Sequence, residues 1–232
     1  MAFFMQWTTF FDLFLFDLDG LLVNTERIHY QGYVESLRRH QLVMPLQFEQ
    51  FCQYAHLSAT LWKEALCKEI PDLAVQWFSI YEEKKRAYLE ILKSLPVDLM
   101  PGVEPLLLHL KEKGVKSVIV THSPKEQVDL ICANLPILQT IMHRITREDY
   151  KEPKPSSECY ELAIQCYGDE RDRIIGFEDS LRGLFALKGT RALPIWICSK
   201  EHPLFSHVDC ETIHFETFSS IPPSGPFQKF LK

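Results

Sequence analysis

The sequence predicts an α/β protein with a doubly wound, mostly parallel sheet and a block of helices inserted after the first strand. Two patterns lead to this prediction. After about residue 101, short apolar runs alternate with amphipathic helical segments, which is typical of βα units and a parallel sheet. Between the first apolar run and residue 98, the spacing of apolar residues is helical, with no convincing strand. A chain of 232 residues is long enough for one large domain carrying such an insertion.

The first expected strand is the apolar run at residues 14–18, which contains Asp17 and is followed directly by Asp19. Side chains along a strand alternate between its two faces, so Asp17 and Asp19 can present their carboxylates on the same side. The pair Asp19-Gly20 between two apolar runs is also a strong signal for a β-hairpin. At this point a hairpin and a catalytic pair of carboxylates are both open.

The segment after this run has helical periodicity. Residues 25–40 place apolar side chains mainly at spacings of three and four, which predicts an amphipathic helix. This helix weakens the hairpin interpretation, because the second strand of a hairpin would be only a few residues long. Further helices are expected at residues 48–66 and 73–92, with prolines between and after them. The block therefore has the character of an inserted helical domain.

The rest of the chain alternates between strands and helices. The expected strands are residues 115–120, 137–145, 173–177 and 193–198, and the expected helices are residues 105–113, 157–167 and 180–189. A further helix is expected to begin with Ser123 as its N-cap, followed by Pro124 in the first turn. Residues 151–155 contain two prolines and are expected to form a loop. The proline-rich tail from Ser219 is expected to be loosely ordered.

The composition narrows the class of protein. A formal net charge of −6 argues against a general nucleic-acid-binding protein, whose binding surface is usually basic. The seven cysteines include no C-x-x-C pair and are irregularly spaced, which favours reduced thiols in the cytosol. The first eleven residues lack the basic start of a secretory signal, and no run approaches the ~18 apolar residues of a membrane span. We therefore expect a cytoplasmic protein that binds neither membranes nor nucleic acids.

Polar side chains follow several of the expected strands. They are Asp17 and Asp19, Thr121, and Glu178 and Asp179, with Lys154 in the proline-containing loop. Ligands of open α/β sheets bind beyond the carboxyl ends of the strands, so we expect these groups to converge there. Two like charges ~4 Å apart repel by about 4 kcal/mol at an effective dielectric near 20, so a cluster of carboxylates needs compensation. The ammonium of Lys154 and a hard divalent cation, Mg²⁺, would supply it.

The segment around Thr121 adds a place for a phosphate. Its hydroxyl lies next to the start of the expected helix, whose free backbone N–H groups and positive end favour phosphate binding. A nucleophilic carboxylate, a metal, a lysine and a phosphate site together suggest phosphoryl transfer through an aspartyl-phosphate.

Four runs occur in order along the chain: FDLDGLLVNTE at residues 16–26, VIVTHS at 118–123, KPSSECY at 154–160 and GFEDSLRG at 176–183. Together they resemble the four motifs of the haloacid dehalogenase-like hydrolases, in the branch with a helical cap that includes the β-phosphoglucomutase and phosphoglycolate phosphatase-like enzymes. The run PGV at 101–103 resembles the second hinge of that cap. The resemblance extends from about residue 14 to residue 198. It implies a Rossmann-like core domain of residues 1–23 and 99–232 and a helical cap domain of residues 24–98.

The resemblance also implies a role for each acid. Asp17 would attack the phosphorus atom and bind Mg²⁺. Asp19 would protonate the leaving oxygen and then activate water, while its backbone carbonyl reaches the metal. This role needs a protonated carboxyl at neutral pH against a reference pKa of about 3.9, so the site must raise the pKa of Asp19. Asp179 would be a direct metal ligand, and Glu178 would act from just outside, directly or through water.

Four further residues are candidates for contact with the substrate. Thr121 and Lys154 match the residues that bind the phosphoryl group and steady the nucleophile. His122 stands where the family usually has a small or amide residue, so it is either a substrate contact or a loop histidine that presents only its backbone N–H. His29 matches a hinge histidine that the mutases use and that many plain phosphatases of the branch share.

These observations favour a Mg²⁺-dependent phosphatase acting on a small phosphorylated metabolite, such as a sugar phosphate or a phosphoglycolate-like compound. A phosphosugar mutase of the β-phosphoglucomutase type is the alternative, because of His29 and the cap. Against it, residues 53–58 lack an obvious Gly/Arg substrate loop like that of the mutases. A non-catalytic phosphate-binding or receiver-like protein is disfavoured by the length of the chain, the inserted block and the intact acid pairs.

Overall fold

The computed structural model describes residues 5–202, 204–209 and 211–227. The chain forms two compact units. The sheet unit consists of Met1–Val23 and Asp98–Lys232, and the helical unit is the continuous segment Asn24–Val97. Within the described ranges, no helix combines the length and the apolar character needed to cross a membrane.

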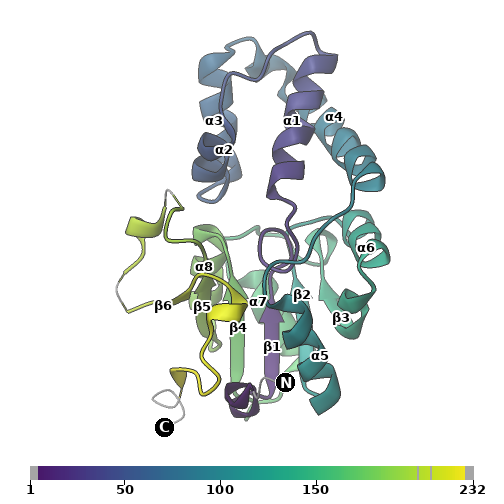
Figure 1. The fold of residues 1–232 in the computed structure, drawn as a ribbon. Helices are drawn as coiled ribbons and strands as arrows, with labels where there is room; N and C mark the ends of the chain where they lie inside the picture. Colours follow the sequence, from purple (N-terminus) through teal and green to yellow (C-terminus); the bar gives the residue numbers. More distant parts are fainter. Residues whose placement is uncertain (1–4, 203, 210, 228–232) are drawn as a thin grey trace. The chain divides into compact units, whose positions relative to one another are not determined.

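A six-stranded parallel sheet forms the centre of the sheet unit (Figure 1). Its strands are β1 (Leu13–Phe16), β2 (Lys116–Val120), β3 (His143–Ile145), β4 (Ile174–Glu178), β5 (Leu193–Ile197) and β6 (Ile213–Phe215), in the spatial order β3-β2-β1-β4-β5-β6. The strand order reverses beside β1, as in other doubly wound sheets, so the predicted fold class is confirmed. All four residues of β1 are buried, as expected for a parallel strand that is covered on both faces.

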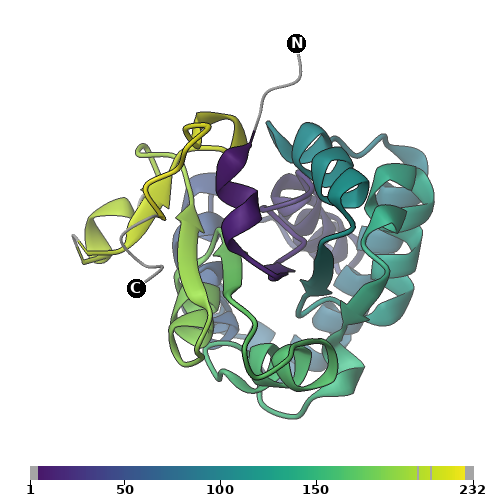
Figure 2. The same ribbon diagram turned by 90° about the horizontal axis from the view of Figure 1, so that it is seen from below.

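Helices and short 3₁₀ turns connect the strands. The helices of the sheet unit are α5 (Val103–Lys113), α6 (Lys125–Asn134), α7 (Glu158–Tyr167) and α8 (Leu181–Lys188), and the 3₁₀ turns are η1 (Gln6–Phe10), η2 (Pro136–Thr140), η3 (Arg147–Asp149), η4 (Phe205–His207) and η5 (Phe218–Ser220). In the view of Figure 2, η1 and α5 lie on one side of the sheet and α7 lies on the other. Because helices cover both faces of the sheet, a ligand can reach the sheet only at the ends of its strands. The polar side chains that follow the strand ends are therefore the candidates for a functional site.

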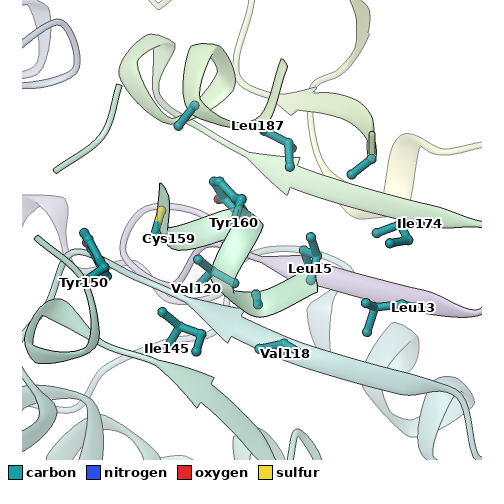
Figure 3. Close-up of a cluster of buried hydrophobic side chains, with 13 residues drawn as sticks. Leu13, Leu15, Val118, Val120, Ile145, Tyr150, Cys159, Tyr160, Ile174 and Leu187 are labelled. Carbon is teal, nitrogen blue, oxygen red and sulfur yellow. The ribbon is translucent and has the colours of Figure 1, made fainter. Parts of the chain in front are cut away.

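The strand residues alternate between two apolar layers, as the pleat of a strand requires. Leu13 and Leu15 of β1 belong to a cluster of buried side chains with α7 (Figure 3). Phe14 and Phe16 belong to the other layer, where the ring of Phe16 stacks on that of Phe177 with centroids 5.4 Å apart. Phe16 of β1 also pairs with Phe177 of β4 in the sheet. The residues that follow these two positions therefore emerge side by side.

The helical unit has a core of its own. Its helices are α1 (Glu26–Arg39), α2 (Phe48–Ala55), α3 (Ala59–Glu69) and α4 (Leu73–Ser94). Aromatic rings fill the space between them, for example Tyr33, Phe51 and Trp62, whose rings pack edge to face or tilted. The absence of a side chain at Gly32 lets α1 approach α4 closely, since a Cβ there would lie 3.3 Å from the carbonyl oxygen of Lys84.

Two expected elements of secondary structure differ in the structure, and the hairpin alternative at Asp19-Gly20 is excluded. β1 pairs in parallel with β2 and β4, and the bridge between Asp19 and Val23 is also parallel. The helix expected at residues 48–66 is two helices, because the hydroxyl of Ser58 accepts a hydrogen bond from the N–H of Thr60 and starts α3. The strand expected at residues 137–145 is the turn η2 followed by the three-residue strand β3.

The C-terminal part of the chain also differs from the expectation. The tail is not loosely ordered over its described residues, because Ile221 and Phe227 are buried. The ring of Phe227 packs 5.2 Å from that of Trp7, and the N–H of Trp7 donates to the carbonyl of Pro223. Residues 228–232 lie outside the described residues. Strand β6 was not predicted, since it is short and none of its residues is fully buried.

Candidate active site

The sheet unit brings three acids together at the carboxyl ends of β1 and β4. Asp17 directly follows β1, Glu178 is the last residue of β4, and Asp179 comes next. One carboxylate oxygen from each of them lies within 4.8 Å of the others. All three residues are buried. The sequence predicted this convergence, and the pairing of β1 with β4 is its structural cause.

Lys154 places its ammonium inside this cluster. The Nζ atom lies 2.5 Å from Oδ1 of Asp17 and 2.6 Å from Oε1 of Glu178, and it donates to the carbonyl of Val120 at 2.9 Å. Burial by itself would lower the pKa of Lys154, but the carboxylates of Asp17 and Glu178 raise it well above its ordinary value. The lysine is therefore a fixed positive charge among the acids.

One positive charge does not balance three buried acids. Burial raises the pKa of Asp17 to about 7; the ammonium of Lys154 opposes this rise, and the carboxylate of Glu178 adds to it. The remaining donors are carboxylate oxygens, which are the ligands that Mg²⁺ prefers. Asp17, Glu178 and Asp179 therefore fit a hard divalent cation, whereas Asp19, whose backbone carbonyl was predicted to reach the metal, is outside this group of side chains.

Tyr160 completes this cluster, and the sequence analysis assigned it no role. Its hydroxyl donates to Oε1 of Glu178 at 2.5 Å and lies 3.2 Å from Nζ of Lys154. The residue is fully buried on α7 and is a labelled member of the apolar cluster in Figure 3. A tyrosine on the inner face of a helix, inside the third motif, was the signal that could have identified it.

Asp19 has a different environment from the three clustered acids. Its Oδ2 accepts a hydrogen bond of 2.5 Å from the hydroxyl of Ser123, and Nε2 of Gln127 lies 3.5 Å from its Oδ1. Gln127 also donates to the hydroxyl of Ser123 at 2.7 Å. Ser123 is therefore not the N-cap expected from the sequence. Pro124 occupies that position in α6, and the serine side chain contacts Asp19 instead.

The segment after β2 carries Thr121 and His122. Thr121 is buried, and its hydroxyl oxygen accepts the N–H of Ser123 at 3.0 Å. The hydroxyl of Tyr150 donates to the carbonyl of Thr121 at 3.2 Å and lies 3.0 Å from Nδ1 of His122. Burial lowers the pKa of His122 to about 3, and the charges of nearby arginines, first Arg182, lower it further. His122 is therefore a neutral ring at physiological pH.

Glycine at position 183 leaves room for the Glu178 carboxylate. A Cβ built on Gly183 would lie 2.0 Å from the carboxyl carbon of Glu178, so the first turn of α8 approaches this acid without a side chain between them. The hydroxyl of Ser180 accepts the N–H of Gly183 at 3.2 Å and lies 3.3 Å from Oε2 of Glu178. The start of α8 therefore holds Glu178 in place.

His29 is the one predicted site residue that belongs to the helical unit. Its Nδ1 lies 2.8 Å from Nζ of Lys84, and its ring stacks on that of Tyr88 with centroids 4.3 Å apart. Lys84 is also buried, with its ammonium 5.2 Å from the ring centre of Tyr33. This histidine is thus held in a fixed orientation within its unit.

Comparisons with known proteins agree with this site. The family model for haloacid dehalogenase-like hydrolases matches residues 11–189. The "Phosphorylated carbohydrates phosphatase" of Thermotoga maritima is 26% identical over 186 residues, which cover 75% of this chain and 79% of that protein.

Two solved structures illustrate the shared fold. One is CbbY from Rhodobacter sphaeroides in complex with xylulose-(1,5)bisphosphate, with a TM-score of 0.72, 21% identity and coverage of 91% of this chain and 96% of that chain. The other is a β-phosphoglucomutase from Clostridium difficile, with a TM-score of 0.71, 17% identity and coverage of 90% and 92%. The resemblance found in the four motifs and the predicted hydrolase class are confirmed. Because the family model spans well over half of its sequence, this chain belongs to the haloacid dehalogenase-like hydrolases.

Proposed function

We propose that this protein is a Mg²⁺-dependent phosphatase that hydrolyses a small phosphorylated metabolite, such as a sugar phosphate or a phosphoglycolate-like compound, through an aspartyl-phosphate on Asp17. The observation that carries the proposal is the buried contact of Lys154 with both Asp17 and Glu178, beside Asp179. The ammonium of Lys154 fixes the orientation of the Asp17 carboxylate and offsets the negative charge of a phosphate, so that the carboxylate can attack the phosphorus atom. A relative named as a phosphatase of phosphorylated carbohydrates, and a structural neighbour solved in complex with a sugar bisphosphate, support this substrate class.

The proposed reaction has two steps. In the first, a carboxylate oxygen of Asp17 forms a bond to phosphorus, the bond from phosphorus to the substrate oxygen breaks, and the carboxyl of Asp19 gives its proton to that oxygen. In the second, water attacks the phosphorus of the aspartyl-phosphate, and Asp19 accepts a proton from the water. The bond between phosphorus and Asp17 then breaks, which releases inorganic phosphate and restores both carboxyls to their starting states.

The binding groups follow from the same geometry. Thr121, His122 and Lys154 are proposed to bind the phosphoryl group, and Lys154 also holds Asp17 in orientation. Asp17, Asp179 and Glu178, with the backbone carbonyl of Asp19, are proposed to hold Mg²⁺; their oxygen donors suit this ion. When bound, Mg²⁺ would neutralise charge on the phosphoryl oxygens.

The remaining parts of the proposal concern the helical unit and the compartment. We assign the helical unit as the family's cap and His29 as a substrate contact within it. The six cysteines among the described residues are free thiols, which supports a cytoplasmic location; Cys210 lies outside those residues.

A metabolite panel tests the proposal. Phosphate release is measured from sugar phosphates, phosphoglycolate and a generic aryl phosphate, for the wild type, for Asp17→Asn and for Asp169→Asn as a matched control, whose side chain is 81% exposed. We expect turnover that requires Mg²⁺, is lost in Asp17→Asn and is retained in Asp169→Asn. Phosphate release that survives Asp17→Asn, or that is indifferent to removal of Mg²⁺, would overturn the mechanism.

The same assay separates the alternative activities. A phosphosugar mutase, which the fold match to β-phosphoglucomutase and the resemblance of His29 to the hinge histidine of the mutases favour, would convert a sugar phosphate into its isomer faster than it releases phosphate. A non-catalytic phosphate-binding protein would turn over none of the compounds. Quantifying the isomer and free phosphate in one reaction therefore decides among the three.

A further inference from the structure

The helical unit contains a second cluster of metal-ligating side chains, formed by Glu26, Cys52 and His56. One carboxylate oxygen, the thiol sulfur and one imidazole nitrogen all lie within 4.8 Å of one another. All three residues belong to the segment Asn24–Val97, whereas the acids of the candidate active site belong to the sheet unit. The mechanism proposed above uses none of these three side chains.

Two of the donors come from one helical turn. Cys52 lies in α2 and His56 follows the end of this helix, four residues later. The N–H of His56 donates to the carbonyl of Cys52 at 3.1 Å, so the turn between them is helical and both side chains lie on the same face. Two ligands at this spacing are a recurring way for one helix to bind a metal ion.

The third donor comes from another helix. Glu26 is the first residue of α1, and its Oε1 contacts Nε2 of His56. Donors from two helices that converge on one point can hold an ion between the helices. The side chains of His56 and Glu26 are 10% and 27% exposed, and Cys52 is buried. The donors are thus sheltered, while the Glu26 side remains open enough for a water molecule or another ligand.

The chemistry of the donors selects the class of metal. Mg²⁺ prefers oxygen ligands, whereas a thiolate, an imidazole and a carboxylate together suit Zn²⁺ and similar divalent transition metals. Three protein ligands with one open position are also a common arrangement for Zn²⁺. We propose that Glu26, Cys52 and His56 bind a divalent transition metal ion of the Zn²⁺ type in the helical unit, separately from the Mg²⁺ site.

The competing explanation is an ion pair between His56 and Glu26, with Cys52 serving as an apolar core residue. Cys52 does pack in the aromatic core of the helical unit. The two explanations differ in what the sulfur does, because only metal binding needs a thiolate. An experiment that reports on the sulfur therefore decides between them.

Binding is measured with the full-length, metal-free protein in excess Mg²⁺, with Zn²⁺ alone as the added probe. Calorimetric titration against a competing chelator gives the affinity, and mass spectrometry of the native protein gives the stoichiometry. We expect one Zn²⁺ per chain in the wild type and in Asp17→Asn, since the latter changes only the sheet unit. Co²⁺ in place of Zn²⁺ is expected to give the near-ultraviolet absorption of a cobalt–thiolate bond.

Single substitutions test the assignment of the ligands. Cys52→Ser and His56→Gln are each expected to weaken Zn²⁺ binding by roughly tenfold or more, and Cys52→Ser should abolish the cobalt–thiolate absorption. Cys67→Ser is the matched control, because Cys67 lies in the same unit and outside the cluster; it should change neither. Circular dichroism monitors folding. If Cys52→Ser fails to fold, the partly exposed Glu26→Gln tests the ligand set through the Zn²⁺ affinity, and the cobalt–thiolate absorption of the wild type reports on the sulfur. Absence of Zn²⁺ binding by the wild type, or binding that these ligand substitutions leave unchanged, would overturn the proposal in favour of the ion pair.

Discussion

The hydroxyl of Tyr160 donates a 2.5 Å hydrogen bond to Oε1 of Glu178, the same oxygen that lies 2.6 Å from the ammonium of Lys154. Burial raises the pKa of Tyr160 well above its ordinary value, and the carboxylate of Glu178 raises it further. The phenol therefore stays protonated and acts as a permanent donor. It gives one buried acid a second partner without adding another charge.

Removing this donor should reduce stability. We expect Tyr160→Phe to lower the free energy of unfolding by about 1–3 kcal/mol, because the buried carboxylate of Glu178 loses a hydrogen bond while the volume of the side chain hardly changes. Urea denaturation measures the change. Tyr167→Phe is the control on the same helix, since Tyr167 is only half-buried and stacks on His143 through its ring. Equal losses in the two variants would show that the contact to Glu178 is not the cause.

Ser123 should affect activity more than stability. Its hydroxyl donates to Asp19, the proposed acid and base, so Ser123→Ala is expected to lower kcat by roughly ten- to a hundredfold with a smaller change in KM. Gln127→Ala should act through the same hydrogen-bonded group, so the double variant is expected to lose less than the sum of the two single losses. Steady-state kinetics on the best substrate of the panel measures these values. Ser157→Ala is the control, because the hydroxyl of Ser157, at the N-cap position of α7, donates to Glu161 and not to Asp19. A kcat of Ser123→Ala equal to that of the control would contradict this role.

His122 should make the fold sensitive to acid. Its pKa falls from an ordinary value of 6.5 to about 3 on folding, so between these values the unfolded chain binds a proton that the folded chain does not. Its contribution to stability is therefore complete above pH 6.5 and decreases as the pH falls toward 3. The expected loss is about 2 kcal/mol at pH 5, since each pH unit below 6.5 is worth about 1.4 kcal/mol.

The measurement compares denaturation curves at neutral pH and at pH 5. His122→Asn should lose less stability on acidification than the wild type, whereas the control His207→Asn, at an exposed position, should behave like the wild type. Identical losses in all three proteins would mean that His122 takes up its proton in the folded state.

The sequence was sufficient for the parts of the fold that depend on periodicity and chain order. Alternating strands and helices predicted the parallel sheet, and the rule that ligands bind at the carboxyl ends of strands brought Asp17, Lys154 and Glu178 together. The structure places these groups in contact. Their proposed roles in catalysis stay predictions until the activity assays are made.

Two of the errors share a physical cause, which is competition between local and distant partners. Ser123 carries the local signature of a helix cap, but its hydroxyl has a carboxylate available from Asp19, more than a hundred residues away in sequence. Local patterns do not contain that alternative. Tyr160 of α7 was missed for the same reason, since its partner Glu178 belongs to a separate element, strand β4. The split between α2 and α3 is different, because Ser58 marks it within the sequence itself.

The central position of β1 has a consequence for how the chain folds. Leu13 pairs with Lys116 on one side and with Ile174 on the other, so the middle of the sheet joins segments that are far apart along the chain. Contacts of this range form slowly, because a long loop must close before they contribute. The helical unit is one continuous segment and is complete long before β4 leaves the ribosome. Asp17 is therefore synthesised well before its partner, and it meets Glu178 only after the whole intervening segment of residues 18–177 has been made.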